Sequence, residues 1–250
     1  MAKGDEDFGV VRRIDGKPLR IHGTVARDLG ISIVSGEYLP GAILDNEVTA
    51  SEELKVSRTA YREAVRILSA KGLVEARPKI GTRVSPRKNW HLLDPDVLYW
   101  MFQREPDEQL LASLFELRRI IEPEGAALAA ERRSDEHLRI MERALQDMRT
   151  HTLATEAGRA ADQLFHSTML DATGNAFLAS LTSGVEAAVS WTTEFKQRKA
   201  PLQRDALPDH IKVFEAVSAA DAVAARAAMV ELVDQAFVDT TGAGKDTAAA

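Results

Sequence analysis

An aspartate and two histidines in the C-terminal half have residue types and a spacing that suit metal chemistry. Asp162 and His166 are four residues apart, so on a helix their side chains project from one face about one turn apart. His210 falls at the start of a later predicted helix. A carboxylate and two imidazoles facing the interior could hold a divalent metal, and these ligands do not select sharply among Zn, Ni and Mn. From spacing alone, a hydrogen-bonded pair without a metal is the commoner interpretation.

Three arginines in the N-terminal third have a spacing that suits nucleic-acid binding. Arg58, Arg62 and Arg66 fall at i, i+4 and i+8, so they line one exposed face of a predicted helix. They belong to the segment Lys55–Lys88, which carries ten basic and two acidic residues. An arginine face by itself is more often solvated surface than a DNA-reading surface. The elements around it must decide.

The composition excludes several classes of site. The chain of 250 residues has no cysteine, which excludes disulfide scaffolds, thiolate zinc sites, iron–sulfur clusters and cysteine nucleophiles. Its net charge of -6 excludes a uniformly basic nucleic-acid coat protein. The N-terminal residues lack the basic patch and apolar run of a signal peptide, and no stretch approaches the roughly 20 apolar residues that cross a bilayer. We therefore expect a cytoplasmic protein with no membrane partner.

The charges divide the chain into two parts. Residues 1–90 carry 16 basic and 12 acidic residues, a net of +4, whereas residues 91–250 carry 16 and 26, a net of -10. A basic block joined to an acidic remainder indicates two bodies with different partners.

The basic part has the element order of a winged helix-turn-helix. A helical stripe is followed by a brief helix, a helix capped by Ser57, and two extended segments around a turn. In this arrangement the second helix of the pair enters the major groove, while the wing holds phosphates. The predicted elements are residues 21–35, 48–55 and 57–70 for the helices and 73–76 and 82–84 for the wing.

Residues 33–84 resemble the DNA-binding domain of the GntR superfamily of bacterial transcription regulators. The family's recognition helix opens with Val-Ser-Arg-Thr-x-x-Arg-Glu-Ala, and here residues 56–64 read VSRTAYREA. Val48 stands where the family often has an arginine, which implies one missing contact and a changed operator preference. The resemblance implies that operator bases or phosphates are contacted by Ser57, Arg58, Thr59, Arg62, Lys79 and Thr82.

From residue 96 onward the pattern predicts helices and almost no strand alternation. Low aromatic content and many alanines suit close helix packing, and Pro123 is expected to kink the second of these helices. The predicted helices are Asp96–Gln103, Asp107–Arg132, Asp135–Thr150, Thr155–Ala172, Ala176–Gln197, Leu207–Ala219 and Ala220–Thr240.

This acidic part resembles the all-helical effector-binding FCD domain of the FadR-like branch of GntR regulators. The matching segments are residues 92–100, 115–133, 162–175 and 209–229. The fold class expected is therefore mostly α, with an N-terminal winged helix-turn-helix followed by an all-helical antiparallel FCD-like bundle. The expected parts are a flexible leader (1–20), the DNA-binding domain (21–85), a linker (86–95), the effector-binding and dimerisation domain (96–240) and a disordered tail (241–250).

The resemblance to this branch also favours a metal site in the acidic part. Metal-binding members of this branch use an Asp-x-x-x-His pair and two later histidines, and three of these are matched by Asp162, His166 and His210. The fourth position falls near Leu232, which cannot ligate. The remaining positions would then be open to water or an effector carboxylate. Alternatively, the pocket has lost its metal and holds an effector directly.

The resemblance also implies an effector pocket around Arg118. An arginine at this place in the family commonly pairs with an effector carboxylate, which accepts two parallel hydrogen bonds from a guanidinium. The alternative is an internal salt bridge from Arg118 to Glu122, four residues on. Further candidates for the pocket are Asn175, Trp191 and Arg204. Residues 92–100 resemble those of regulators of sugar-acid catabolism, which implies a galactonate-, gluconate- or hexuronate-like effector.

We expect a homodimeric, non-enzymatic repressor that binds double-stranded operator DNA and is released by a small carboxylate. One alternative is a metal-responsive regulator without an organic effector. A further alternative is a metal-dependent hydrolase that activates water at the Asp162/His166/His210 group. Against an enzyme, the chain has no glycine-rich phosphate loop, G-x-S-x-G elbow or H-E-x-x-H pair.

Overall fold

The computed structural model describes residues 20–78, 80–199 and 204–241, and the chain forms two compact units. The first unit ends at Arg104 and the second begins at Glu105. The expected leader apart from Arg20, and the expected tail apart from Thr241, lie outside the described residues. Within the described part, every helix is too short or too polar to cross a membrane.

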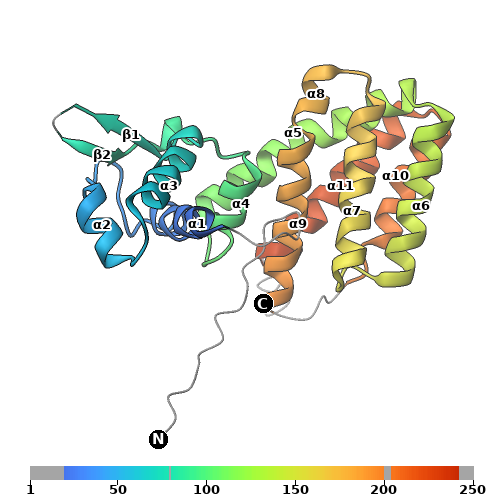
Figure 1. Cartoon of the computed structure of the whole chain (residues 1–250). Helices are drawn as coiled ribbons and strands as arrows, with labels where there is room; N and C mark the ends of the chain where they lie inside the picture. The colour runs from blue at the N-terminus through green and yellow to red at the C-terminus, as the bar shows by residue number, and fades with distance from the viewer. Residues whose placement is uncertain (1–19, 79, 200–203, 242–250) are drawn as a thin grey trace, which may run out of the picture. The chain divides into compact units, whose positions relative to one another are not determined.

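The N-terminal unit is a winged helix-turn-helix, as the sequence predicts. Three helices are followed by a two-stranded antiparallel sheet, a short 3-10 helix and one more α-helix (Figure 1). These elements are α1 (Ile21–Val34), α2 (Glu47–Glu53), α3 (Arg58–Ala70), β1 (Val74–Arg77), β2 (Gly81–Val84), η1 (Arg87–Asn89) and α4 (Pro95–Met101).

Side-chain caps set where α2 and α3 begin. The Asn46 side chain accepts hydrogen bonds from the main-chain N–H groups of the first turn of α2, and the Ser57 hydroxyl accepts one from the Ala60 N–H at 3.1 Å. Such caps satisfy donors that the helix itself leaves unpaired. The buried side of α3 then consists of Tyr61, Ala64 and Leu68. The opposite side of α3 is left for the polar and basic residues.

The wing is a short antiparallel hairpin. Val74 pairs with Val84 and Arg77 pairs with Gly81. Gly81 has a φ of 108°, which a side chain would disfavour, so glycine suits this turn. A single bridge between Ile43 and Arg83 extends the sheet beyond the hairpin.

The helix α4 packs on α1 within the N-terminal unit. The Trp100 ring is buried directly over Gly30, where an added Cβ would lie 2.3 Å from a ring carbon. Lys71, at the end of α3, forms ion pairs with Asp94 at 2.6 Å and Asp96 at 2.8 Å, which join α3 to the start of α4. The contacts therefore divide the chain after Arg104, whereas the sequence places the helical domain from residue 96 onward.

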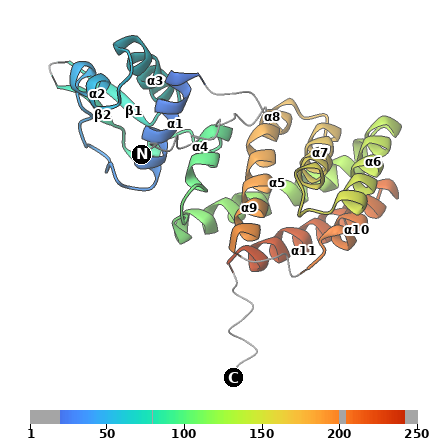
Figure 2. The same ribbon diagram turned by 60° about the horizontal axis from the view of Figure 1, so that its bottom comes forward.

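The C-terminal unit consists of helices in two layers. In Figure 1, α9, α7 and α6 lie side by side in front, and α5, α11 and α10 lie behind them; Figure 2 shows the same two groups after rotation. The helices are α5 (Glu108–Arg132), α6 (Asp135–His151), α7 (Glu156–Ala172), α8 (Ala176–Ser180), α9 (Thr182–Lys199), α10 (Leu207–Ser218) and α11 (Ala222–Thr241).

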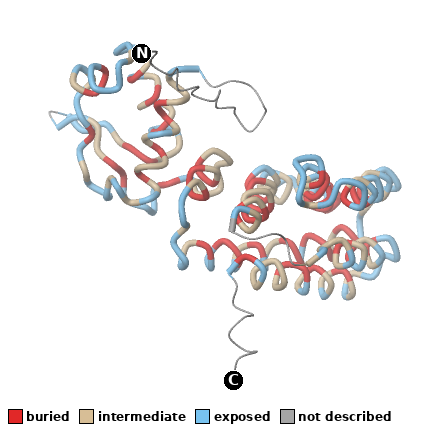
Figure 3. The backbone as a smooth tube through the Cα atoms, turned by 90° about the horizontal axis from the view of Figure 1, so that it is seen from below, coloured by how far each residue is buried: buried red, intermediate tan, exposed pale blue. Residues whose placement is uncertain are grey.

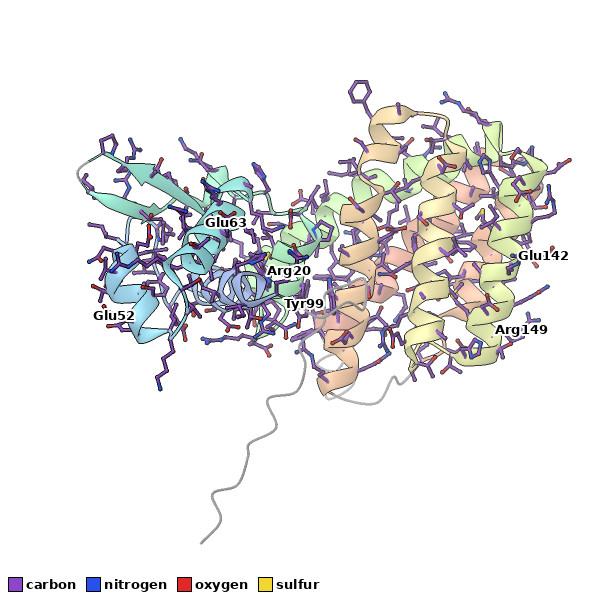
Figure 4. All side chains as sticks on the ribbon, in the orientation of Figure 1. Arg20, Glu52, Glu63, Tyr99, Glu142 and Arg149 are labelled. Carbon is purple, nitrogen blue, oxygen red and sulfur yellow. The ribbon has the colours of Figure 1, made fainter. Side chains whose placement is uncertain are left out.

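Buried residues, red in Figure 3, occur on the helices of both layers of this unit. Phe165, Met169 and Met229 have no exposed surface. Polar residues cover the outside; Glu142 and Arg149, for example, are exposed on α6 (Figure 4). Where helices of both layers bury residues, side chains from several helices can meet.

The predicted helix over residues 176–197 is wrong in one respect. The structure has two helices there, α8 and α9, separated at Leu181. Ser180, Thr182, Ser183 and Gly184 surround this point, and all four are weaker helix formers than alanine. Ser180 donates its hydroxyl to the Phe177 carbonyl at 2.7 Å, which supports the end of α8.

Candidate functional site

The exposed side of α3 presents two arginines that have no ion-pair partner among the described residues. Arg58, Thr59 and Arg62 are exposed, and neither arginine forms an ion pair with another residue of the described chain. Arg66, one turn further on, is instead paired with Glu63 at 2.7 Å. The four predicted contact residues at the start of this helix, Ser57 included, therefore lie together. Guanidinium groups without an internal partner can accept phosphate or a guanine edge without breaking an existing pair.

The wing carries a second set of basic groups, held in place by one carboxylate. Glu75 accepts from Arg83 Nη2 at 2.6 Å and from Arg77 Nη2 at 2.8 Å, and these contacts lower the pKa of Glu75. Thr82 is half-buried, and its main-chain carbonyl accepts from the Leu44 N–H. Lys79, the other predicted wing contact, lies outside the described residues. Contact of any of these residues with DNA remains a prediction.

The C-terminal unit brings Asp162, His166 and His210 together. Their candidate ligand atoms all lie within 4.8 Å of one another, and all three residues are buried. Asp162 and His166 come from α7, and His210 comes from α10, as their spacing and helix positions predict. No other His, Asp or Glu of the described residues joins this group. Leu232 is buried on α11 and, as an apolar side chain, adds no ligand.

The geometry of this metal cluster, as we call the three residues, suits a cation. Asp162 Oδ1 lies 2.8 Å from His210 Nε2 and 3.6 Å from His166 Nε2, and the two Nε2 atoms are 3.4 Å apart. Yet Asp162 Oδ1 is buried without a well-directed hydrogen bond. A buried carboxylate oxygen of this kind is costly unless a cation compensates it. One carboxylate and two imidazoles are ligands that Zn, Ni and Mn accept.

Two further groups contact the histidines from behind. His166 Nδ1 lies 2.9 Å from Glu122 Oε2, and His210 Nδ1 lies 2.9 Å from the Ala206 carbonyl oxygen. Phe165 packs edge-on against the His210 ring, with centroids 5.2 Å apart. The Nδ1 atom of each imidazole thus contacts Glu122 or the Ala206 carbonyl oxygen, and the Nε2 atom of each is left on the side of Asp162.

The electrostatics of the site depend on one buried ion pair. Arg118 Nε donates to Glu122 Oε1 at 2.5 Å, and both side chains are almost fully buried. Burial alone would raise the pKa of Glu122, but Arg118 and His166 together lower it to about 2. Burial likewise opposes the charged form of His210, and the neighbouring Asp162 carboxylate outweighs it, so the pKa of His210 is raised.

Three of the predicted effector residues, Arg118, Asn175 and Arg204, make contacts within the C-terminal unit. Arg118 forms an internal ion pair with Glu122, which is the alternative to effector binding that their i, i+4 spacing offers. Asn175 caps α8, where its Oδ1 accepts from the Phe177 and Leu178 N–H groups. Arg204 is paired with Asp209 and with Asp239. Trp191 is half-buried on α9. A role for any of them in effector binding remains a prediction.

Sequence reasoning missed two charged residues of this region. Glu122 was considered only as a partner of Arg118, because its contact with His166 joins two different helices and leaves no mark on local spacing. Lys196, on α9, has a pKa lowered by burial despite the opposing charges of Asp239 and Asp162. It has no hydrogen bond or ion pair with another described residue. No spacing signal marks Lys196.

Two family models match the chain. The model described as bacterial regulatory proteins, gntR family, matches residues 22–84, which include the helix-turn-helix and the wing. The FCD domain model matches residues 113–235, which include the metal cluster.

Characterised relatives are similar over most of their length. The galactonate operon transcriptional repressor of Escherichia coli (strain K12) is 34% identical over 211 residues, which cover 82% of this chain and 90% of the relative. The HTH-type transcriptional regulator LutR of Bacillus subtilis (strain 168) is 32% identical over 204 residues, which cover 79% and 91%. These are proteins named as transcriptional regulators.

A solved structure supports the fold. It is described as that of Lar, which controls the expression of the Listeria monocytogenes agr system and mediates virulence. It aligns with a TM-score of 0.63 at 17% identity and covers 90% of this chain and 98% of that one. At this identity the likeness concerns the fold alone.

Proposed function

Because this chain belongs to the GntR family of bacterial regulatory proteins and carries an FCD domain, we propose that it is a ligand-controlled repressor of a catabolic operon. In this proposal a small sugar-acid-like carboxylate releases the repressor from double-stranded DNA. The protein acts in the cytoplasm as a homodimer. The observation that carries the proposal is a buried group of one aspartate and two histidines, able to hold a metal ion, in the FCD domain of a chain with a GntR-type DNA-binding domain.

The DNA-binding part of the proposal rests on α3 and the wing. Two copies of α3 would enter successive major grooves of a near-palindromic operator, with Arg58 and Arg62 at the base edges or phosphates. Arg77 and Arg83 of the wing, which Glu75 holds in place, would contact the phosphate backbone of the DNA. The remaining proposed contacts are made by Ser57, Thr59, Lys79 and Thr82. Domain ranges of 21–85 for DNA binding and 96–240 for effector binding and dimerisation are part of the same proposal.

The effector part rests on the metal cluster. Asp162, His166 and His210 would hold one divalent ion of Zn, Ni or Mn, which when bound supplies open coordination positions to an anionic ligand. Three protein ligands leave such positions because Leu232 supplies none. The similarity to a galactonate operon repressor supports a sugar acid as the class of effector. Its carboxylate suits a cationic site, and Arg204, Asn175 and Trp191 are proposed to contact its remainder.

The proposal is tested by measuring operator affinity with the full-length protein. A promoter fragment from the protein's own operon is titrated by fluorescence anisotropy with a panel of sugar acids, Zn²⁺, or both. At least one sugar acid is expected to raise the Kd about tenfold or more, which needs about 1.4 kcal/mol of coupling. Failure of every acid, with and without metal, would overturn the effector proposal.

The same titration separates the alternatives. A metal-responsive regulator without an organic effector, which the metal cluster also favours, would release DNA on addition of Zn²⁺ alone. A metal-dependent hydrolase would instead hydrolyse a sugar-acid lactone in the presence of Zn²⁺, and the substitution His166→Ala would abolish this activity.

A further inference from the structure

We propose that Glu122 is a positioning residue for the metal cluster: it keeps the proton of His166 on Nδ1 and so aims the Nε2 lone pair at Asp162 and His210. The inference rests on the proposed metal-binding role of those three residues. It assigns to Glu122 a task that neither spacing nor the family comparison assigns.

The contact between Glu122 and His166 requires a proton between them. His166 Nδ1 lies 2.9 Å from Glu122 Oε2, close but without a well-directed hydrogen bond, and both side chains have almost no exposed surface. Two lone pairs at this separation would repel each other with no water to screen them. A proton on Nδ1 removes the repulsion, and a neutral imidazole carries a single ring proton. Nε2 is then left as an acceptor, which is the state that a metal ligand needs.

His210 is also expected to carry its proton on Nδ1, but its partner there is a main-chain carbonyl rather than a carboxylate. Its Nδ1 lies 2.9 Å from the main-chain carbonyl oxygen of Ala206, an atom that can only accept. In the neutral state, Nδ1 therefore carries the proton of His210 as well. Both Nε2 atoms face Asp162 Oδ1, and the two are 3.4 Å apart. With both imidazoles neutral, these three atoms are acceptors that face one another, and either a proton on His210 Nε2 or a metal ion would compensate them.

Arg118 completes the arrangement by holding Glu122. Its Nε lies 2.5 Å from Oε1 and its Nη2 lies 3.4 Å from Oε2 of that carboxylate, within one turn of α5. The guanidinium keeps Glu122 ionised and fixes its orientation, because a buried carboxylate needs a paired cation. Arg118 thus acts on the metal cluster indirectly, by holding Glu122, which in turn contacts His166. This role explains why an arginine is buried here even without an effector.

The first test reads the tautomer of His166 directly. Long-range ¹H–¹⁵N spectra of the metal-free, full-length protein are recorded with ¹⁵N-labelled histidine, and His166→Gln assigns the signal among six histidines. The wild type is expected to show His166 protonated at Nδ1. The double variant Arg118→Met/Glu122→Met removes the buried pair as a unit, so that no unpaired charge remains. In that variant the Nε2-protonated form is expected to gain population.

The second test measures the affinity for Zn²⁺ alone, by competition with a chromophoric chelator. The double variant and Glu122→Gln are expected to bind Zn²⁺ about 10- to 100-fold more weakly than the wild type, the usual cost of losing such a partner. The matched control is Glu124→Gln, two residues along α5, which breaks an exposed pair with Arg226 and leaves the cluster untouched. The control should bind Zn²⁺ like the wild type.

Two results would overturn the inference. One is a wild-type His166 protonated at Nε2 in the metal-free protein. The other is a Zn²⁺ affinity in the double variant within about threefold of the wild type. A wild type that binds no Zn²⁺, or an Asp162→Asn variant that binds it normally, would instead overturn the proposed metal site. The tautomer measurement does not depend on that outcome, so the two failures are distinguishable.

Discussion

At the scale of single residues, the FCD domain places several ionisable side chains out of contact with water. Burying a charge is costly, and each of these groups is compensated by a neighbour rather than by solvent. Glu122 is compensated by Arg118, and His210 lies against Asp162. Two buried atoms, Asp162 Oδ1 and His166 Nδ1, are exceptions, because their neighbours approach without a well-directed hydrogen bond. Both atoms belong to the residues proposed to hold a metal ion.

This compensation predicts a large cost for breaking the buried pair. Arg118→Met leaves Glu122 as an unpaired carboxylate in the interior, so the free energy of unfolding should fall by about 3–5 kcal/mol. The measurement is urea denaturation followed by circular dichroism.

Two controls accompany Arg118→Met. Arg226→Met breaks the exposed pair with Glu124 and should cost less than about 1 kcal/mol. The double variant Arg118→Met/Glu122→Met should recover much of the lost stability. Equal losses for the two single variants would mean that the buried pair is worth no more than a surface pair.

On the DNA-binding side, the residue with the clearest expectation is Arg62. It is exposed, lies one turn from Arg58, and has no ion pair to break within the described chain. Arg62→Ala should cost about 1–3 kcal/mol of operator binding, roughly 5- to 150-fold in Kd, while the thermal stability stays unchanged. The affinity is measured by fluorescence anisotropy at a fixed salt concentration, because the affinity of a protein for DNA varies steeply with ionic strength.

The control for Arg62→Ala is an arginine of equal charge on the other unit. Arg149 is exposed on α6, as Figure 4 shows, and Arg149→Ala should leave operator affinity within about twofold. If Arg62→Ala were as harmless as Arg149→Ala, α3 would not be the helix that reads the operator.

At the scale of elements, local rules were sufficient where the signal is local. The Ser57 cap, the range of α3 and the turn of the wing are each determined within a few residues, and the structure has them close to the prediction. The i, i+4 spacing of Asp162 and His166 likewise placed both on one helix.

What the sequence could not give depends on contacts between distant segments. The break between α8 and α9 at Leu181 is surrounded by weak helix formers but no proline, so no strong helix-breaking signal marks it. Glu122 meets His166 only because α5 packs on α7. The attachment of α4 to α1 depends on Trp100 filling the space that Gly30 leaves free. None of these pairings produces a periodic pattern along the chain.

The α1–α4 contact predicts the outcome of a substitution that propensity alone would get wrong. In a free helix, Gly30→Ala should stabilise by about 1 kcal/mol. Here the added methyl group would lie 2.3 Å from a carbon of the Trp100 ring, so the overpacking should outweigh that gain and destabilise by about 1–3 kcal/mol. Urea denaturation of the full-length variant measures the net effect.

A compensating substitution checks the cause. Gly30→Ala/Trp100→Leu leaves room for the new methyl group, so adding Gly30→Ala to a Trp100→Leu background should no longer destabilise. A penalty of the same size in both backgrounds would place the strain elsewhere than at Trp100.

At the scale of the whole molecule, the charge division matches the division into units. The basic residues of Lys55–Lys88 lie in the winged helix-turn-helix, and the acidic remainder forms the helical FCD unit. Asp162, His166 and His210 are buried in the acidic unit and cannot themselves touch DNA. Control of DNA binding by these residues must therefore act through a difference in the free energy of two states of the chain.

Such control is reciprocal, and reciprocity gives the final prediction. If a sugar acid raises the operator Kd tenfold, saturating operator DNA must raise the Kd for that acid by the same tenfold, since both report one coupling free energy of about 1.4 kcal/mol. Isothermal titration calorimetry of the Zn²⁺-loaded protein, with and without a saturating operator duplex, measures the second factor. Asp162→Asn should lose the acid-dependent factor while keeping the wild-type operator affinity. A factor that kept rising with operator concentration would mean that the acid and the operator compete for one surface, and unequal plateau factors would mean that the acid also binds at a second site; either result would contradict a repressor with one acid site coupled to its operator.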